Sequence, residues 1–400
     1  MFGFKKRIYL DYASATPVHP KAARALSDAM GVFANPGALH SEGVLAKGFL
    51  TASRERIAKQ LGCKARELIF TSGLTESNTI AIVGAARALE VRRRFLEGTH
   101  WVVSAIEHSS VLECFAEVER MGGKVTHVYP DKKGLITPEE IAKALRPDTV
   151  FISIGWGNNE IGTVQPLSGI ARALHRHEKG NRANILFHSD AGQAPLYLSP
   201  QVNSLGVDLF SLGSGKLYGP RGVGALHLSN RVSALPVTHG GGQERGLRPG
   251  TEEPALAAGF AKALDLITLE RDAEVKRLRK LRDDFAREIV ARIPGTVING
   301  DLKHTLPHML NVSIPGERTG EYLVLALDHA GLSLSTKSAC REGEADSHVV
   351  VCLAEAEAKA GNKPVSEWRA RNTLRFSLGR DTTAGDLKRA LSVLKKISSC

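Results

Sequence analysis

The stretch Ser214-Gly215-Lys216-Leu217-Tyr218-Gly219-Pro220 and the upstream stretch Asp190-Ala191-Gly192-Gln193 carry most of the chemical information in this chain. A lysine that forms a Schiff base, with a carboxylate that pairs with a pyridinium nitrogen, is what pyridoxal phosphate requires of a protein. Taken alone, Lys216 could be a solvated lysine and Asp190 could cap a helix. Asp190, however, follows the apolar run Ile185-Leu186-Phe187, where an unpaired carboxylate would be costly. Together the stretches predict a pyridoxal-phosphate enzyme.

Between about residues 64 and 228, short apolar runs alternate with amphipathic stretches. The apolar runs have strand character, and they cover residues 68–70, 101–103, 125–128, 150–154, 185–187 and 208–210. The stretches between them have helical character, as at 76–89, 111–120 and 138–145. Strands that alternate with helices predict an α/β unit with a mostly parallel sheet, covered by helices on both faces. We expect this unit to be the large, cofactor-binding domain, residues 18–262.

The C-terminal part of the chain predicts a second unit. Residues 261–292 contain no Pro or Gly and are rich in Ala, Leu, Arg and Glu, which favours one long helix leaving the large domain. Strand-like runs at 309–314 and 374–378, with helical stretches at 319–330 and 384–397, follow it. A chain of 400 residues is long for one core. We therefore expect a small α+β domain formed by residues 1–17 and 263–400.

Composition narrows the class of protein. The 53 Lys and Arg against 42 Asp and Glu give a net charge of +11. The basic residues are dispersed, so direct binding of nucleic acid is not expected, although an acidic partner would be attracted. No apolar run has the roughly 18 to 20 residues of a membrane span, and the N-terminus lacks the apolar core of a signal peptide. We expect a cytoplasmic protein without membrane attachment.

The five cysteines are Cys63, Cys114, Cys340, Cys352 and Cys400. They are odd in number and contain no C-x-x-C pair, so we expect reduced thiols rather than a disulfide framework. The same spacing gives no indication of a metal site.

Four further segments carry a resemblance to a known family. They are Tyr9-Leu10-Asp11-Tyr12-Ala13, residues 71–78 (Thr-Ser-Gly-Leu-Thr-Glu-Ser-Asn), residues 335–340 (Ser-Thr-Lys-Ser-Ala-Cys) and residues 375–380 (Arg-Phe-Ser-Leu-Gly-Arg). In this order, from about Ile8 to about Leu394, the chain resembles the cysteine desulfurases, class V members of the fold-type I pyridoxal-phosphate enzymes. The resemblance implies the fold-type I architecture and the conversion of L-cysteine to L-alanine. Residues 335–340 end in Ser-Ala-Cys, and this ending resembles the corresponding segment of the long-loop group of these enzymes.

Residues 71–75 link an expected strand to an expected helix. The first amides of a helix, together with its dipole, bind phosphate well, so we expect Leu74 and Thr75 to hold the cofactor phosphate. A simple capping box is the alternative interpretation. The resemblance adds a phosphate-contacting Ser-Gly-His-Lys run, for which this chain has Gly213-Ser214-Gly215-Lys216. Gly213 and Gly215 stand where the family has serine and histidine, so both of those side chains are absent. Ser214 could supply a hydroxyl instead. We expect this chain to bind the cofactor more weakly than is usual for the family.

Three polar residues are candidates for contacts with the cofactor ring or the substrate. The resemblance implies that His108 stacks on the ring and takes part in acid–base chemistry, although a lone histidine is more often structural. It also implies that Gln193 contacts the ring and that Asn159 binds the cofactor or the substrate carboxylate. Asn159 and Gln193 could instead be turn residues.

Two residues extend the predicted site further. Within the glycine-rich stretch 240–251, the resemblance implies that Thr251 reaches the phosphate bound by a second subunit, and hence a homodimer with shared active sites. It also implies that Arg375 binds the α-carboxylate of the substrate, a task suited to a planar, two-pronged donor.

Cys340 is the residue that distinguishes the expected reaction from the other reactions of this large superfamily. It lies in a segment of small and polar residues that predicts a flexible loop, where Lys337 and Arg341 would favour its thiolate. An isolated cysteine is more often a small buried hydrophobe. The resemblance instead implies that Lys216 moves the proton at the substrate Cα and that Cys340 attacks the substrate sulfur to become a persulfide.

The resemblance also implies a sulfur acceptor, either an iron–sulfur scaffold protein or a tRNA-thiolation protein. Because a shared fold does not determine function, two alternatives remain. One is another class V enzyme, an aminotransferase or a selenocysteine lyase. The other is a non-catalytic adaptor that binds RNA or protein through its basic surface.

Overall fold

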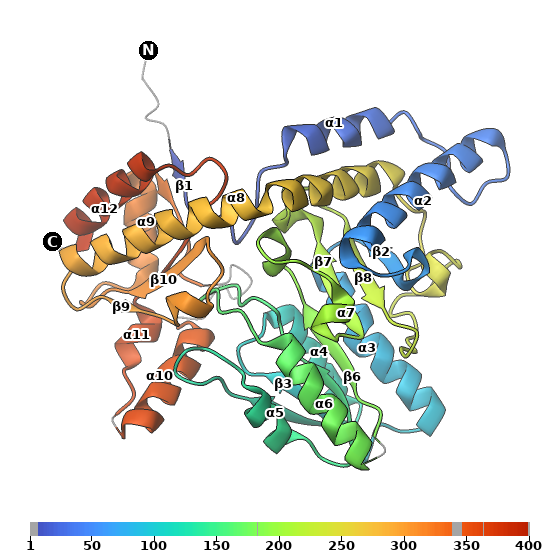
Figure 1. Cartoon of the computed structure of the whole chain (residues 1–400), viewed down its shortest axis with the longest axis horizontal. Helices are drawn as coiled ribbons and strands as arrows, with labels where there is room; N and C mark the ends of the chain where they lie inside the picture. The colour runs from blue at the N-terminus through green and yellow to red at the C-terminus, as the bar shows by residue number, and fades with distance from the viewer. Residues whose placement is uncertain (1–6, 182, 338–345, 363, 399–400) are drawn as a thin grey trace.

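A seven-stranded sheet forms the centre of the larger part of the molecule in the computed structural model, which describes residues 7–181, 183–337, 346–362 and 364–398 (Figure 1). Its strands, in spatial order, are β2 (Leu68–Thr71), β8 (Gly224–Leu228), β7 (Leu209–Gly213), β6 (Leu186–Asp190), β5 (Thr149–Ser153), β3 (His100–Ser104) and β4 (Lys124–Val128). Strand β8 runs antiparallel to both of its neighbours, and the other neighbouring pairs are parallel. The expected mostly parallel sheet is confirmed.

Helices cover both faces of this sheet. Successive side chains of a strand point to opposite faces, so Val102 joins one buried apolar cluster and Val103 joins the other. Helices α3 (Leu74–Arg93) and α4 (Ser109–Arg120) pack on the face of Val103. Three further helices contribute to the cluster of Val102, and they are α2 (Ser41–Leu61), α5 (Pro138–Ala144) and α6 (Leu167–Asn181). A buried sheet of this kind presents the ends of its strands to ligands.

Helix α8 (Pro254–Arg292) joins the two parts of the molecule. Pro254 stands at its first turn, where a missing N–H costs nothing, and the Glu253 side chain accepts a hydrogen bond from the Ala255 N–H. With 39 residues it is about 58 Å long at 1.5 Å per residue. It contacts α1 (Pro20–Ala29) and α2 on one side of the molecule and β10 (Met309–Ser313) and α12 (Ala384–Ser398) on the other. The expected long helix is confirmed.

The smaller part contains two further sheets. Strands β12 (Thr373–Ser377), β10 (Met309–Ser313) and β9 (Val297–Ile298) form an antiparallel sheet, and β1 (Ile8–Tyr9) pairs in parallel with β11 (Leu332–Ser333). The helices of this part are α9 (Gly320–His329), α10 (His348–Gly361), α11 (Glu367–Arg371) and α12 (Ala384–Ser398). The N-terminal strand thus lies with C-terminal elements. The division of the chain at residues 262 and 263 remains a prediction, since α8 passes through it without a break.

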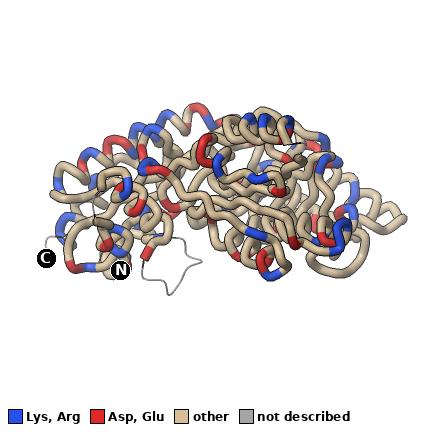
Figure 2. Tube along the Cα trace, turned by 90° about the horizontal axis from the view of Figure 1, so that it is seen from below, with Lys and Arg blue, Asp and Glu red and all other residues tan. Residues whose placement is uncertain are grey.

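Short helices complete the described chain. They are α7 (Val202–Leu205) and the 3₁₀ turns η1 (Ala65–Glu67), η2 (Ala194–Leu196), η3 (Ser214–Lys216), η4 (Glu244–Gly246) and η5 (Leu302–His304). Figure 2 shows Lys and Arg spread along the whole length of the molecule and interleaved with Asp and Glu. None of the helices in the described ranges combines the length and the apolar character needed to cross a membrane.

Candidate active site

One pocket brings together residues that lie far apart in the sequence. Asp190 is the last residue of β6, and Lys216 follows the end of β7, the parallel neighbour of β6. The carboxyl ends of these strands therefore meet at the same edge of the sheet, where ligands bind in open α/β folds. Six of the residues that the sequence analysis singled out line this pocket, namely Leu74, His108, Asn159, Asp190, Gln193 and Lys216.

Two hydrogen bonds hold the Asp190 carboxylate. Its Oδ1 accepts from the Gly192 N–H at 2.8 Å, and its Oδ2 accepts from Asn78 Nδ2 at 2.7 Å. Asn78 also donates to Ser110 Oγ at 2.9 Å. Sequence reasoning did not assign a role to Asn78, although a signal was present, because Asn78 follows Leu74 by one helical turn on the same face of α3. Asn78 orients the carboxylate that is expected to pair with the cofactor ring.

His108 serves as a helix cap and as a wall of the pocket. It precedes α4, and its Nδ1 accepts a hydrogen bond from the Ser110 N–H at 3.1 Å. A neutral imidazole that accepts at Nδ1 carries its proton on Nε2. The cap fixes the ring orientation, so the structural interpretation of His108 and the functional one are compatible.

The start of α3 forms a cradle suited to a phosphate. Gly73 precedes this 20-residue helix and offers no side-chain cap, so the cap residue leaves the first N–H groups without a side-chain acceptor, and Leu74 at the start of the helix lines the pocket. A Cβ on Gly213 would lie 3.0 Å from Leu74 Cβ and 3.4 Å from Leu74 N. A Cβ on Gly192 would lie 2.5 Å from Leu74 Cδ2. The absence of both side chains keeps the space beside the Leu74 amide open, and the donors present fit pyridoxal phosphate.

The other predicted phosphate contacts are Ser214, Thr75 and Thr251, and none of them lines the pocket. Ser214 is buried, and its hydroxyl faces Gly219, where an added Cβ would come within 2.1 Å of Ser214 Oγ. Ser214 does not belong to the residues that line the pocket. Thr75 is exposed on the first turn of α3, and Thr251 is exposed in the segment before α8. A contact of Thr251 with a phosphate in a second subunit remains a prediction.

Arg375 reaches the edge of the pocket from the smaller part of the molecule. It lies on β12 and is only 1% exposed. One Nη donates to the Asn159 backbone carbonyl at 2.8 Å, and the other donates to Asp11 Oδ1 at 2.8 Å and to Ser14 Oγ at 2.7 Å. Three acceptors from two distant parts of the chain therefore hold the guanidinium in one orientation. Sequence reasoning assigned no role to Asp11 or Ser14.

Cys340 lies outside the described residues, but the chain on either side of it is anchored beside the pocket. On one side, Ser335 pairs with Arg375 through backbone hydrogen bonds, and buried Lys337 forms an ion pair with Glu321 at 3.2 Å. On the other side, Ser347 Oγ donates to Glu160 Oε2 at 2.5 Å. Glu160 is the neighbour of Asn159 in the chain.

Glu107 is a further buried acid in the same pocket. Its Oε1 accepts from the Gly155 N–H at 2.8 Å, and the residue is 5% exposed. Burial raises the pKa of the Glu107 carboxyl to about 8, with a smaller contribution from Asp190. The side chain is therefore mostly protonated at neutral pH and adds little negative charge beside Asp190.

We expect Glu107→Gln to change how stability depends on pH. Between the ordinary pKa of 4.5 and about 8, the folded protein keeps a proton that the unfolded chain releases, so native stability falls as pH rises through this window. Glutamine removes this dependence, and the variant should gain on the order of a few kcal/mol relative to the native protein between pH 5 and pH 8. Denaturant unfolding at both pH values measures it. Glu113→Gln, at an exposed position of α4, is the control; an unchanged pH slope in Glu107→Gln would contradict the assignment.

Comparison with known proteins agrees with this geometry. The sequence model of the aminotransferase class-V family matches residues 8–390. The chain is 39% identical to the cysteine desulfurase IscS of Dictyoglomus turgidum over 395 residues, covering 98% of this chain and 95% of that protein. It is also 35% identical to the putative cysteine desulfurase IscS 1 of Bacillus subtilis, covering 96% of this chain and 97% of the relative.

Two solved structures extend the comparison. A NifS-like protein superposes with a TM-score of 0.87 at 30% identity, covering 98% of this chain and 99% of the other. SspA, solved in complex with cysteine, superposes with a TM-score of 0.74 at 31% identity, covering 93% of this chain and 98% of the other. The family match, the relatives and the pocket around Lys216 agree, and the chain belongs to the cysteine desulfurases of the aminotransferase class-V family.

Proposed function

We propose that this protein removes sulfur from L-cysteine, with pyridoxal phosphate at Lys216 and with Cys340 as the group that takes up the sulfur. The observation that carries the proposal is the pocket in which Lys216, Asp190 and His108 meet, with the chain on both sides of Cys340 anchored at its edge. The relationship to cysteine desulfurases supports the same reaction.

Different residues of the pocket would hold different parts of the cofactor. Lys216 would bind its aldehyde carbon, Asp190 its ring nitrogen and His108 its ring face, and the amides of Leu74 and Thr75 would bind its phosphate. Gln193, whose Nε2 donates to the Ala13 carbonyl at 2.8 Å, would contact the ring from the turn after Asp190, and Thr251 of a second subunit would add a phosphate contact. When bound, pyridoxal phosphate would withdraw electrons from the substrate Cα. Asn78 and Gly192 keep the Asp190 carboxylate oriented for its role.

The chain's own groups would then perform the transfer. Arg375 binds the α-carboxylate of cysteine, and the Lys216 amine takes the Cα proton and returns protons to the carbon skeleton. The Cys340 thiolate attacks the substrate sulfur, so that the C–S bond breaks as the new S–S bond forms. The products are L-alanine and a persulfide on Cys340, and all atoms of L-cysteine and the thiol are accounted for.

The anchored residues on either side of Cys340 support the proposal that this cysteine takes up the sulfur. Cys340 follows Lys337 by three residues, a chain segment that spans at most about 11 Å. Lys337 itself is held by Glu321 next to the Ser335–Arg375 pairing. Cys340 therefore follows, by only three residues, a segment that is fixed beside the arginine proposed to bind the carboxylate. We propose that an iron–sulfur scaffold protein or a tRNA-thiolation protein receives the sulfur, and that the reaction takes place in the cytoplasm.

Product analysis tests the proposed reaction. Incubation of the protein with pyridoxal phosphate, L-cysteine and dithiothreitol should yield alanine and sulfide in equal amounts. An aminotransferase would instead need a keto-acid acceptor and would give 3-mercaptopyruvate. A selenocysteine lyase would release alanine from selenocysteine and not from cysteine, and an adaptor would form no product. Any of these three results would contradict the proposal.

We expect Arg375→Lys to weaken substrate binding. Lysine cannot offer two parallel donors to a carboxylate, and hydrogen bonds to charged groups are worth about 1.5–3 kcal/mol. The KM for L-cysteine should rise about 10- to 100-fold, with a smaller change in kcat. Steady-state alanine formation measures both parameters. Arg120→Lys, an exposed substitution on α4, should leave both unchanged; a native KM in Arg375→Lys would exclude Arg375 as the carboxylate clamp.

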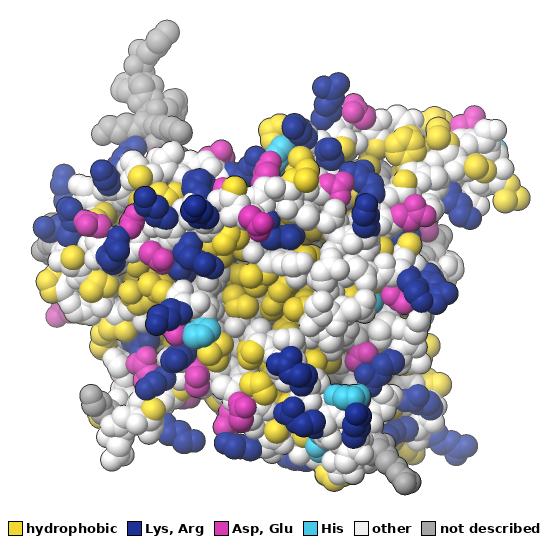
Figure 3. Space-filling view, viewed as in Figure 1, with side chains coloured by type: hydrophobic (Ala, Val, Ile, Leu, Met, Phe, Trp, Pro, Cys, Tyr) yellow, Lys and Arg dark blue, Asp and Glu magenta, His cyan; other side chains and the backbone are white. Residues whose placement is uncertain are grey.

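We also propose that the active protein is a homodimer. Large apolar side chains are exposed on and between α1 and α2, where Figure 3 shows apolar surface at the upper right, and they include Met30, Phe33, Leu39, Val44 and Leu45. Phe33 is 86% exposed and Leu39 is 97% exposed, which a monomer rarely tolerates in a cluster. Sedimentation equilibrium should give twice the chain mass of 43.0 kDa. A monomer at micromolar concentration would contradict the dimer.

A further inference from the structure

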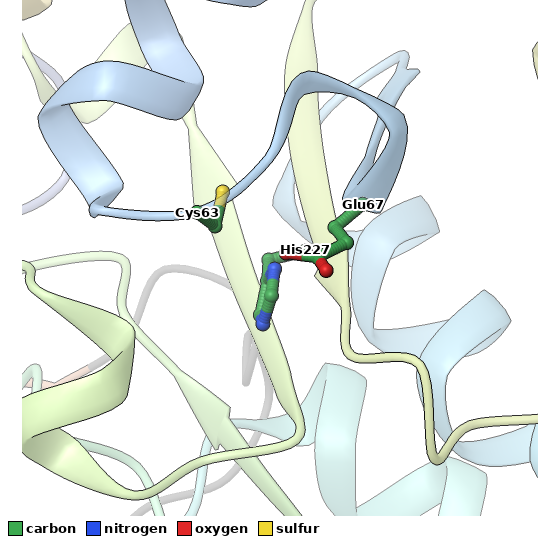
Figure 4. A group of neighbouring side chains, drawn as sticks. All are labelled: Cys63, Glu67 and His227. Atoms are coloured by element: carbon green, nitrogen blue, oxygen red, sulfur yellow. The ribbon is translucent and has the colours of Figure 1, made fainter.

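Cys63, Glu67 and His227 meet outside the active-site pocket (Figure 4). One sulfur, one carboxylate oxygen and one imidazole nitrogen of these residues lie within 4.8 Å of one another. Cys63 and Glu67 belong to the connection between α2 and β2, and His227 lies on β8. Thiolate, imidazole and carboxylate are the donors that bind Zn²⁺ in proteins.

The backbone holds each of the three donors in place. Gly62 ends α2 in the left-handed conformation, with φ of 66°, and the Cys63 N–H donates to the Ala58 carbonyl at 3.0 Å. The Glu67 carboxylate accepts from the Lys64 N–H at 3.0 Å. His227 is fixed by strand pairing, because it lies opposite Leu68, the residue that follows Glu67. The register of β2 and β8 therefore brings the histidine to the other two side chains.

His227 provides independent evidence for a ligand. The residue is 3% exposed, and within the described ranges its Nδ1 has no hydrogen-bond partner. Buried polar atoms in folded proteins nearly always have a binding partner. An unpaired ring nitrogen beside a thiol and a carboxylate therefore indicates that a ligand binds at this position.

We propose that Cys63, Glu67 and His227 form a binding site for a divalent transition-metal ion, with a donor set suited to Zn²⁺. Zinc bonds of about 2.0–2.3 Å in tetrahedral geometry place donors roughly 3.3–3.8 Å apart, so the side chains must close by about 1 Å. Cys63 and Glu67 are only partly buried and can make this movement. Three protein donors leave the fourth position to water.

The site is separate from the desulfurase chemistry. His227 lies three residues along β8 from Gly224, which approaches Gly73 in the phosphate cradle, and three residues of a strand span about 10 Å. A bound ion would connect the α2–β2 segment to β8. Its expected effect is therefore on the stability of the large α/β part, and this inference does not depend on which substrate the enzyme takes.

Metal binding to the full-length holoenzyme tests the site directly. The protein is stripped with a chelator and dialysed, then titrated with Zn²⁺ and, in parallel, with Co²⁺ as a spectroscopic probe. We expect one high-affinity ion per chain, a thiolate-to-cobalt charge-transfer band, and a rise of a few degrees in the unfolding temperature on addition of Zn²⁺. Cys63→Ser should abolish the cobalt band, and Glu67→Gln, at a partly exposed position, should weaken binding at least 10-fold.

Cys340→Ser is the matched control, because it removes a different thiol. It should keep the ion and the thermal shift. Unchanged metal affinity in both Cys63→Ser and Glu67→Gln would overturn the proposal, as would a native protein that binds no ion. Loss of the ion in Cys340→Ser alone would place the metal at the active-site thiol and would also overturn it.

Discussion

Replacing Lys216 with Ala should lower the rate of alanine formation from L-cysteine by about 10⁴-fold or more. General-base removal alone accounts for about 10²- to 10⁴-fold, and this variant also loses the covalent attachment of the cofactor. The position of Lys216 beside Asp190 and Gly192 in one pocket is the structural reason. Single-turnover measurements of alanine over hours can follow a loss of this size.

The Lys216→Arg variant tests whether activity requires only a positive charge at this position or the covalent bond to the cofactor. Arginine keeps a positive charge in the pocket but cannot form a Schiff base with the cofactor aldehyde, so we expect it to be as inactive as the Ala variant. Borohydride reduction followed by intact-mass measurement should show cofactor bound covalently to the native protein and to neither variant. Activity within 10-fold of the native rate in Lys216→Ala would refute the role assigned to this lysine.

Replacing Cys340 with Ala should have the second large effect, a loss of about 10³-fold or more in alanine formation. Without a thiol to accept the sulfur, the C–S bond has no partner for its cleavage, and loss of a nucleophile commonly costs this much or more. Cofactor binding should stay native, because the residues around Lys216 and Asp190 are unchanged. Cys352→Ala, a buried thiol on α10, is the control for general loss of a cysteine. Equal activity in native and Cys340→Ala proteins would mean that sulfur leaves without this thiol.

The central sheet could be predicted because most of its strands, unlike the partly exposed β4, are buried on both faces. Such strands appear as short, continuous apolar runs, and the runs around Leu68, Val102 and Ile152 correspond to β2, β3 and β5. Helix α2 could not be found in the same way. Its buried face mixes the small residues Gly43, Ala46 and Ser53 with the large apolar residues Leu50, Ile57 and Leu61, so the apolar pattern is weak in the first half of the helix.

The pocket was predictable where single motifs contain the functional residues. Lys216 and Asp190 are such cases, since each lies in a recognisable stretch at the end of a strand. Contacts that depend on three-dimensional register were not predictable. The bonds of Arg375 to Asp11 and Ser14 join the two ends of the chain.

The group of Cys63, Glu67 and His227 shows the same limit. Its spacing matches no metal motif, because Cys63 and Glu67 precede β2 and His227 joins them only through the pairing of β2 with β8. The sequence analysis accordingly gave no indication of a metal site, and the metal proposal rests on the geometry alone.

Mapping the sulfur on the protein tests the central claim most directly. The native enzyme, loaded with pyridoxal phosphate, is given L-cysteine for one turnover without reductant, the thiols and persulfides are alkylated, and the peptides are analysed by mass spectrometry. The account predicts one extra sulfur atom on the peptide of Cys340, together with one alanine per active site. Alanine formation with the extra sulfur on another cysteine, or with no persulfide on the chain, would contradict it.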